Sequence, residues 1–185
     1  MGSPHPLHVD YATVPELIEL VTYVAESISL DFERWDEAYV RGPSLYFVLV
    51  SGTHARNYAD PLGENTWPVD VCEVVTDDLD AFVDAAASVA FNCDGAVIVS
   101  GDGTVQEQMV RIKSPSPGTF DDDQTVEYAD WMGTKHLSAV ESSIREEVLA
   151  AVTLSEETGR VTVFEDGEYM DFQRDELGGL WRPAE

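Results

Sequence analysis

The pattern of apolar and polar positions predicts a helix and then a buried strand in the first third of the chain. Apolar residues recur at helical spacing from Val14 to Ile28 and form one face. Thr13 and Glu16 have the spacing of a capping box at the start of this segment. The segment 44–52, SLYFVLVSG, is a short continuous apolar run bounded by Pro and Gly, which favours a buried strand.

The middle of the chain predicts a strand, a helix, a hairpin and a loop. Residues 69–75 alternate like a half-buried strand. Thr76 then has the position of an N-cap for a helix over 77–92, whose early aspartates suit the positive end of a helix dipole. Residues 94–112 predict two strands joined by a Gly-Asp-Gly turn. The segment 113–130 is rich in Pro, Gly, Ser and acidic residues, so we expect a long loop that is functional or mobile.

The last third predicts a second major helix, a strand and another hairpin. The helix is expected over 133–148, with Leu137, Val140, Ile144 and Val148 in register on one face. Residues 149–155 favour a buried strand, and 159–172 favour a hairpin about Asp166 and Gly167. Because hairpins and helical crossovers both occur, we expect a single α/β domain with a mixed central β-sheet flanked by helices.

The net charge of the chain argues against one class of binding partner, the nucleic acids. The 185 residues include 36 acidic and 10 basic ones, for a formal net charge of −26. Nucleic-acid-binding surfaces neutralise phosphates with Lys and Arg, so we expect no nucleic-acid partner. The acidic residues are spread along the whole chain, which favours a halophilic protein kept hydrated in a salt-rich cytoplasm. An acidic mesophilic protein is the alternative, but it explains less well why Lys113 and Lys135 are the only lysines.

Location and redox state follow from what the sequence lacks. No apolar run follows a basic N-terminus, and no segment approaches the roughly 20 apolar residues of a membrane span. We therefore expect a cytoplasmic protein that does not bind a membrane. Cys72 and Cys93 are too few and too far apart for a disulfide framework or a metal knuckle, so both are expected to be reduced and buried.

Three polar clusters lie at the ends of predicted sheet elements, where α/β folds place ligands. In the first cluster, Asp94 and Gly95 precede an apolar strand. The carboxylate then lies at a strand edge, and the glycine allows another group to approach the backbone closely. Asp-Gly is also a common turn signal, which is the simpler interpretation of this pair.

The second cluster marks the start of the predicted helix. Gly133 and Thr134 expose backbone N–H groups at the positive end of the helix, where an anion is favoured. Lys135 and His136 add two further donors. The alternative is a Thr N-cap followed by two solvated side chains.

The third cluster is SEETGRV, residues 155–161. Two carboxylates leave a buried strand just before a glycine turn. Such a pair can hold Mg²⁺ or Mn²⁺ through oxygen ligands. Two glutamates in a turn are otherwise simply solvated.

The order and spacing of the three clusters resemble the diadenylate cyclase family. DGA, then a Gly-Thr-basic-His helix start, then SEETG followed by a basic residue all occur within residues 76–167. The family includes the N-terminal domain of the bacterial DNA-integrity scanning protein, and the short acidic layout here looks like an archaeal, haloarchaeal member. Where the family commonly has Arg-His-Arg, this chain has Lys135, His136 and Leu137.

The resemblance implies an activity and a set of site residues. Enzymes of the family condense two ATP molecules into cyclic di-AMP and release two pyrophosphates, with a divalent metal, Mn²⁺ or Mg²⁺. By this likeness Asp94 and His136 are catalytic, and Asp94 and Glu157 bind the metal. The residues implied in nucleotide binding are Gly95, Ala96, Thr134, Lys135, Ser138, Ser155 and Glu156.

The resemblance also implies how the chain is organised and assembled. Residues 76–185 form the diadenylate cyclase-like core, and residues 1–75 supply an N-terminal helix and strands that complete the sheet. Each ribose 3′-OH must attack the other molecule's α-phosphate, so two pockets face each other in a dimer or a higher oligomer.

Two other hypotheses remain open at this point. The same pocket in a nucleotide-binding sensor binds ATP or cyclic di-AMP without turnover, which Leu137 favours mildly. The intact Asp94 and the run 155–157 favour the enzyme. An acidic interaction module without a pocket has to treat all three motif matches as chance.

Overall fold

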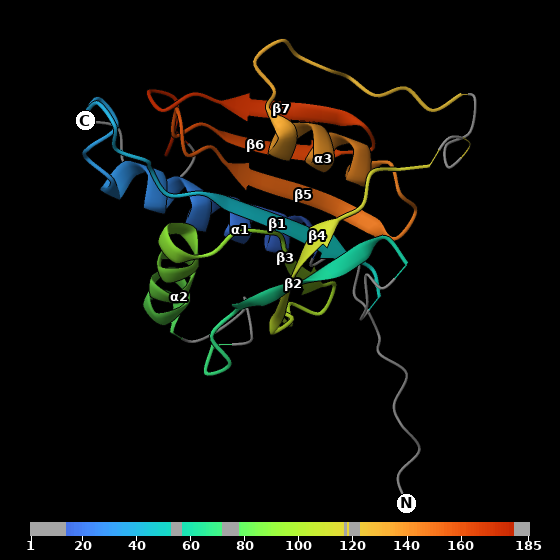
Figure 1. The fold of residues 1–185 in the computed structure, drawn as a ribbon, viewed down its shortest axis with the longest axis horizontal. Helices are drawn as coiled ribbons and strands as arrows, with labels where there is room; N and C mark the ends of the chain where they lie inside the picture. Colours follow the sequence, from blue (N-terminus) through green and yellow to red (C-terminus); the bar gives the residue numbers. More distant parts are fainter. Residues whose placement is uncertain (1–13, 53–56, 72–77, 117, 119–122, 180–185) are drawn as a thin grey trace, which may run out of the picture.

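The computed structural model describes residues 14–52, 57–71, 78–116, 118 and 123–179. These residues form one α/β domain (Figure 1). Its elements, in chain order, are α1 (Val14–Asp31), β1 (Leu45–Val50), β2 (Ala59–Thr66), α2 (Leu79–Asn92), β3 (Val97–Ser100), β4 (Gln108–Ile112), α3 (Thr134–Ser143), β5 (Val148–Leu154), β6 (Val161–Glu165) and β7 (Glu168–Phe172).

The central sheet has five strands in the order β3-β1-β5-β6-β7. β1 and β3 are parallel, whereas β1–β5, β5–β6 and β6–β7 are antiparallel, so the prediction of a mixed sheet is confirmed. β2 and β4 form a separate two-stranded sheet. The predicted hairpin of residues 94–112 is present as antiparallel bridges between Ala96 and Val110 and between Val99 and Val105, but β4 pairs mainly with β2.

Helices cover both faces of the sheet, which explains why β1 is apolar at every position. Phe47 and Leu49 pack with α1 and α2 in one core, and Val48 and Val50 pack with α3 in the other. Successive residues of a strand point to opposite faces. A strand covered on both faces is therefore a continuous apolar run, as the segment 44–52 predicts. Figure 1 shows α3 over the face opposite α1.

The helix boundaries partly correct the sequence analysis. α1 covers the predicted segment and continues to Asp31, whereas Thr13 lies outside the described residues. The N-cap of α2 is Asp78, whose carboxylate accepts a hydrogen bond of 3.0 Å from the Ala81 N–H. Thr76, the predicted cap, lies outside the described residues.

The strand predicted over 69–75 is wrong for the part that is described. Val69 and Asp70 form a turn, and residues 72–75 lie outside the described ranges. The Val71 N–H donates to the Pro68 carbonyl at 3.2 Å, and the Trp67 indole N–H donates to the Val71 carbonyl. These two bonds close the turn, and no pattern of apolar residues indicates them.

α3 is shorter than predicted, and one residue of its predicted apolar face, Leu137, is exposed. It ends at Ser143, and Val148 begins β5. Of the predicted apolar face, Val140, Ile144 and Val148 are buried, whereas Leu137 is 37% exposed. The residues of the helix that are buried are His136, Ala139, Val140, Ser142 and Ser143. The Ser142 and Ser143 hydroxyls donate to backbone carbonyls of the same helix at 2.6 and 2.7 Å. Their polar groups are satisfied within the helix, so small polar residues can lie against the sheet.

The remaining expectations concern turns, loops and cysteines. The β6–β7 hairpin turns at Asp166 and Gly167, both with positive φ (50° and 81°), as predicted. The described part of the segment 113–130 contains neither helix nor strand. Cys93 is a free thiol and is partly exposed rather than buried, and Cys72 lies outside the described residues. Among the helices described, none has the length and apolarity that crossing a membrane requires.

Candidate functional site

The second and third polar clusters meet in one cavity of about 200 Å³. The start of α3 forms one side of it, and the turn between β5 and β6 forms the other. Its lining consists of Trp131, Gly133, Thr134, Lys135, His136, Ser155, Glu156, Glu157, Thr158 and Arg160. We call this cavity the α3 pocket.

The turn after β5 is held tightly by its own backbone and by α1. The Gly159 N–H donates to the Ser155 carbonyl at 2.9 Å, and the Ser155 N–H donates to the Arg160 carbonyl at 3.0 Å. Gly159 has φ +71°, and a Cβ there would lie 2.8 Å from both Ser29 Oγ and Trp35 Cε2. The Ser29 hydroxyl also donates to the Gly159 carbonyl at 2.6 Å. Only glycine fits this position, and the backbone of the turn that carries the two glutamates is therefore held in place.

The first turn of α3 carries no side-chain cap. Gly133 occupies the N-cap position, and it makes no side-chain hydrogen bond to the helix. Thr134 is the first helical residue, so the alternative interpretation of a Thr N-cap is wrong. The uncapped N–H groups and the helix dipole favour an anion at this end of the helix.

Lys135 is not solvated, contrary to the simpler interpretation of the sequence. Its ammonium donates to Ser44 Oγ and, at 3.1 Å, to the Leu154 carbonyl. Burial lowers the pKa of Lys135 to about 8, although the charges of Glu156 and Asp94 act to raise it. Lys135 therefore joins the start of α3 to the ends of β1 and β5, within the electrostatic reach of Asp94.

His136 is 7% exposed and lines the α3 pocket. Its ring lies edge-on to Trp131, with ring centres 5.0 Å apart. Burial, and then the positive charges of Lys135 and Arg160, lower the pKa of His136 to about 4. The imidazole is therefore neutral near pH 7, and its buried Nε2 has no hydrogen-bond partner among the described residues.

The two glutamates of the turn differ in their surroundings. Glu156 Oε1 accepts a hydrogen bond of 2.7 Å from Arg41, and the Glu156 backbone carbonyl accepts one of 3.1 Å from Gly42. Glu157 is exposed at the pocket rim, and its N–H donates to Ser155 Oγ at 3.4 Å. The described residues contain no group of three or more His, Cys, Asp or Glu side chains that could hold a metal ion.

The DGA cluster lies outside the lining of the α3 pocket. Asp94 is exposed after the end of α2. Gly95 has φ +104°, and a Cβ there would lie 2.6 Å from Leu62 Cδ2 and 2.9 Å from the Val110 carbonyl oxygen. The group that approaches this glycine closely is therefore the β2–β4 sheet. Ala96 is buried and its N–H donates to the Val110 carbonyl at 2.7 Å.

Ser138 also lies outside the lining of the α3 pocket. Its hydroxyl shares a hydrogen bond of 3.2 Å with the Tyr46 hydroxyl. The structure thus brings Thr134, Lys135, His136, Ser155, Glu156 and Glu157 together in the pocket lining. It does not bring Asp94, Gly95, Ala96 or Ser138 there.

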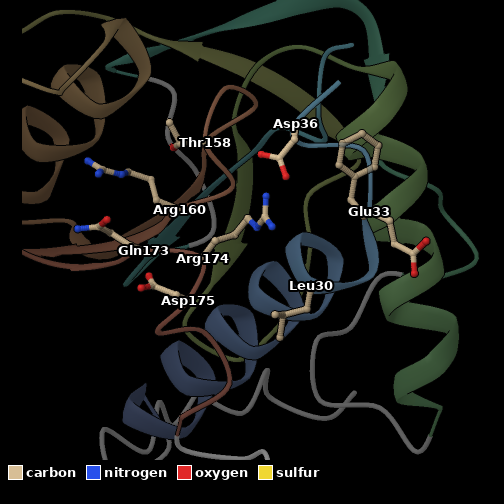
Figure 2. A pocket seen from close by; sticks show the side chains of 9 residues that line it. Leu30, Glu33, Asp36, Thr158, Arg160, Gln173, Arg174 and Asp175 are labelled. Atoms are coloured by element: carbon tan, nitrogen blue, oxygen red, sulfur yellow. The ribbon is translucent and has the colours of Figure 1, made fainter. Parts of the chain in front are cut away.

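Two pocket residues, Trp131 and Arg160, are absent from the set implied by the resemblance. The Arg160 guanidinium lies 4.0 Å from the centre of the Trp131 ring. Arg160 also lines a neighbouring groove of about 770 Å³, shown in Figure 2 with Asp36 and Arg174. The sequence signal for Arg160 is its place directly after SEETG. Trp131 lies between the long loop and α3, where no periodic pattern identifies it.

The fold has counterparts among solved structures. A double mutant of DacA from Staphylococcus aureus, a diadenylate cyclase, matches with a TM-score of 0.53 and 21% identity over 90% of this chain and 93% of that one. A hypothetical membrane spanning protein from Bacillus cereus matches with a TM-score of 0.55 and 14% identity, over 84% and 62% of the two chains. No family model and no curated protein sequence matches. The chain therefore has a diadenylate cyclase-like fold.

Proposed function

We propose that this protein is a diadenylate cyclase, which condenses two ATP molecules into cyclic di-AMP and releases two pyrophosphates. The observation that carries the proposal is the α3 pocket, in which the GTKH and SEETG motifs meet on a diadenylate cyclase-like fold. In the reaction each ribose 3′ oxygen forms a bond to the α-phosphorus of the other ATP. The bond from that phosphorus to the bridging oxygen of pyrophosphate breaks, pyrophosphate leaves with the electron pair, and the hydroxyl proton passes to water.

The residues at the start of α3 support phosphate binding. Negative charge is stabilised at an uncapped helix N-terminus by the N–H groups and the helix dipole. Lys135, with a pKa of about 8, keeps its positive charge near pH 7. His136 is neutral there, so its role is to offer a hydrogen bond rather than a charge. Thr134 and Ser155 complete the polar lining.

The carboxylates around the pocket suit a divalent ion held partly by the substrate. Mg²⁺ is commonly bound by one or two carboxylates together with substrate phosphates, so a cluster of three protein ligands is not required. Asp94 and Glu157 are the side chains proposed to hold Mn²⁺ or Mg²⁺. Glu157 lies at the pocket rim, whereas Glu156 is engaged by Arg41. Asp94 lies outside the pocket lining, but its charge acts on Lys135. The bound ion supplies neutralisation of the phosphate charge. Asp94 helps to activate the ribose 3′-OH.

A dimer follows from the symmetry of the reaction. One pocket presents one ATP, so two pockets have to face each other across a two-fold axis for the mutual attack. Two surfaces with a formal charge of −26 each repel one another, and salt screens this repulsion. Self-association at high ionic strength is therefore part of the proposal.

The test is to incubate the purified protein with ATP and Mn²⁺ or Mg²⁺ at low and high salt, and to search for cyclic di-AMP by mass spectrometry. We expect product from the parent and no product from Asp94→Asn, which removes the anionic ligand but conserves shape. Asp84→Asn, at an exposed position on α2, is the matched control and keeps activity. Normal turnover by Asp94→Asn removes Asp94 from the mechanism.

A nucleotide sensor without turnover is the second candidate. Two observations favour it: Lys135 is already bound to Ser44 and to the Leu154 carbonyl, and Leu137 is an exposed apolar side chain where the family commonly has a cation. Binding of ATP or cyclic di-AMP without any product, with either metal and at every salt concentration, would establish the sensor and contradict the enzyme.

A further inference from the structure

Arg160 occupies a fixed place at the wall of the α3 pocket. Its side chain is 15% exposed, and its guanidinium lies 4.0 Å from the centre of the Trp131 ring. Asp171 Oδ2 lies 3.6 Å from its Nη1, and the Thr162 hydroxyl holds the same carboxylate through a hydrogen bond of 2.9 Å to Oδ1. Stacking on one side and a charge on the other restrict the orientation of the guanidinium.

Two of the guanidinium nitrogens of Arg160 lack a hydrogen-bond acceptor in the described part of the protein. Its Nε and Nη1 are buried and have no hydrogen-bond partner among the described residues, because Asp171 lies beyond hydrogen-bond distance. In Figure 2 the Arg160 guanidinium points away from Asp36 and Arg174, the charged side chains in the middle of the groove. A buried donor without an acceptor costs free energy, and an oxyanion bound beside the guanidinium would reduce that cost.

A second polar group in the same pocket also lacks a partner. His136, 7% exposed, lines the α3 pocket with Nε2 unpaired among the described residues. The uncapped first turn of α3 lies in the same lining. Three kinds of donor therefore surround one small cavity: a guanidinium, a neutral imidazole and backbone N–H groups. Phosphate has several acceptor oxygens and binds such sets well.

We propose that Arg160 binds a phosphate group of the ligand and supplies a cation in the pocket in addition to Lys135. The identity of that ligand as a nucleotide rests on the proposed function. Lys135 is tied to β1 and β5, so the guanidinium of Arg160 is the cation whose buried donors remain without acceptors. Arg160 lines the neighbouring groove as well, but its guanidinium points away from the middle of that groove.

Carboxylates at the pocket do not contradict phosphate binding. Glu156 is neutralised by Arg41 at 2.7 Å, and Asp171 is shared with Thr162. Glu157 remains at the rim without an ion pair to a basic side chain among the described residues. A divalent ion between Glu157 and the phosphates would join the two negative groups.

The test measures binding of inorganic triphosphate, ATP and adenosine by calorimetry at matched ionic strength. We expect Arg160→Gln to weaken binding of triphosphate and ATP by about tenfold or more, the usual effect of losing a charge-assisted hydrogen bond, and to leave adenosine binding unchanged. Arg111→Gln is the matched control: it also removes one positive charge, but from an exposed position on β4 that lines neither cavity. Its affinity for triphosphate and ATP is expected to differ from that of the parent by less than roughly twofold.

The outcomes separate this inference from the proposed function. Equal triphosphate binding by the parent and Arg160→Gln overturns the role of Arg160, and so does an equal loss in Arg111→Gln. If thermal unfolding shows that Arg160→Gln does not fold, Arg160→Lys replaces it, because it keeps the charge but loses the planar stack on Trp131. The affinity of Arg160→Lys for triphosphate is then expected to be roughly several-fold lower than that of the parent, and parent-like affinity overturns the inference.

Synthesis of cyclic di-AMP tests the other proposal. If triphosphate binding depends on Arg160 but no cyclic di-AMP forms, the enzyme is contradicted and the role of Arg160 stands. If cyclic di-AMP forms and Arg160→Gln binds ATP like the parent, only the role of Arg160 is contradicted. A parent protein that binds neither triphosphate nor ATP overturns both.

Discussion

Replacement of His136 tests whether the pocket really buries a neutral imidazole. In the folded protein burial, Lys135 and Arg160 lower the pKa of His136 from 6.5 to about 4. The unfolded chain keeps the ordinary pKa, so it takes up a proton below pH 6.5 that the folded protein refuses until about pH 4. The unfolding free energy therefore falls as the pH is lowered through this interval.

The size of the effect follows from the two pKa values. The loss of unfolding free energy through this one group is about 2 kcal/mol between about pH 7.5 and about pH 5, and approaches about 3 kcal/mol near pH 4. A loss of 2 kcal/mol is a large share of the total stability of an ordinary domain. His136→Gln and His136→Phe have no titrating group at this position, so their stability should fall less over the same interval.

Urea unfolding at fixed ionic strength measures this difference directly. The unfolding free energies of the parent and of each variant are compared at several pH values, so that the titration of the many carboxylates cancels in the difference. Parallel curves for the parent and both variants between about pH 7.5 and about pH 5 would show that His136 titrates normally. The assignment of a buried neutral imidazole to the pocket would then be wrong.

Two further predictions concern the DGA turn and the assembly. Gly95→Ala should lower the unfolding free energy by about 1–3 kcal/mol in thermal or urea unfolding, because φ is +104° and the new Cβ meets Leu62 and the Val110 carbonyl. Gly52→Ala, where a Cβ meets no atom within 4 Å, is its control, and an equal loss in both would contradict the steric argument. The specific activity of the parent should fall on dilution at fixed high salt and rise with ionic strength, because the proposed reaction needs paired pockets. Light scattering that shows a monomer throughout, with activity independent of concentration, would contradict the dimer.

The sequence predicts correctly those elements whose residue pattern is determined by one local feature, such as burial on both faces or a tight turn. β1 is apolar throughout because it is covered on both faces, and the Asp166-Gly167 turn has the positive φ values that such a hairpin requires. The sequence also predicts that GTKH begins a helix and that SEETG follows a strand. Both predictions hold, and the two motifs line one cavity because α3 packs over β5 and β6.

Long-range pairing accounts for most of what the sequence did not predict. β2, with the sequence ADPLGENT, contains Pro, Gly and mainly polar side chains, and it exists because β4 supplies its hydrogen-bond partners. The apolar pattern of α3 predicts the burial of Val140 but not that of the small and polar residues beside it, His136, Ala139, Ser142 and Ser143. The sequence identifies Arg160 only as a basic residue that follows SEETG. Its contact with Trp131 joins the segment before α3 to the turn after β5, and the spacing of residues in the sequence does not encode this packing.

The acidic composition of the chain raises the question of how it could attract a triphosphate, and the positive side chains of the pocket offer an answer. A chain with a formal charge of −26 repels a triphosphate at long range, so a site for that ligand needs attraction that acts at short range. Lys135 and Arg160 are both partly buried beside the uncapped end of α3, where solvent and salt screen charge less than at the surface. Salt at about 1 M shortens the range of exposed charges to about 3 Å. It therefore reduces the repulsion from the acidic surface more than it reduces the attraction within the pocket, so an acidic surface and a phosphate site can coexist in one small domain.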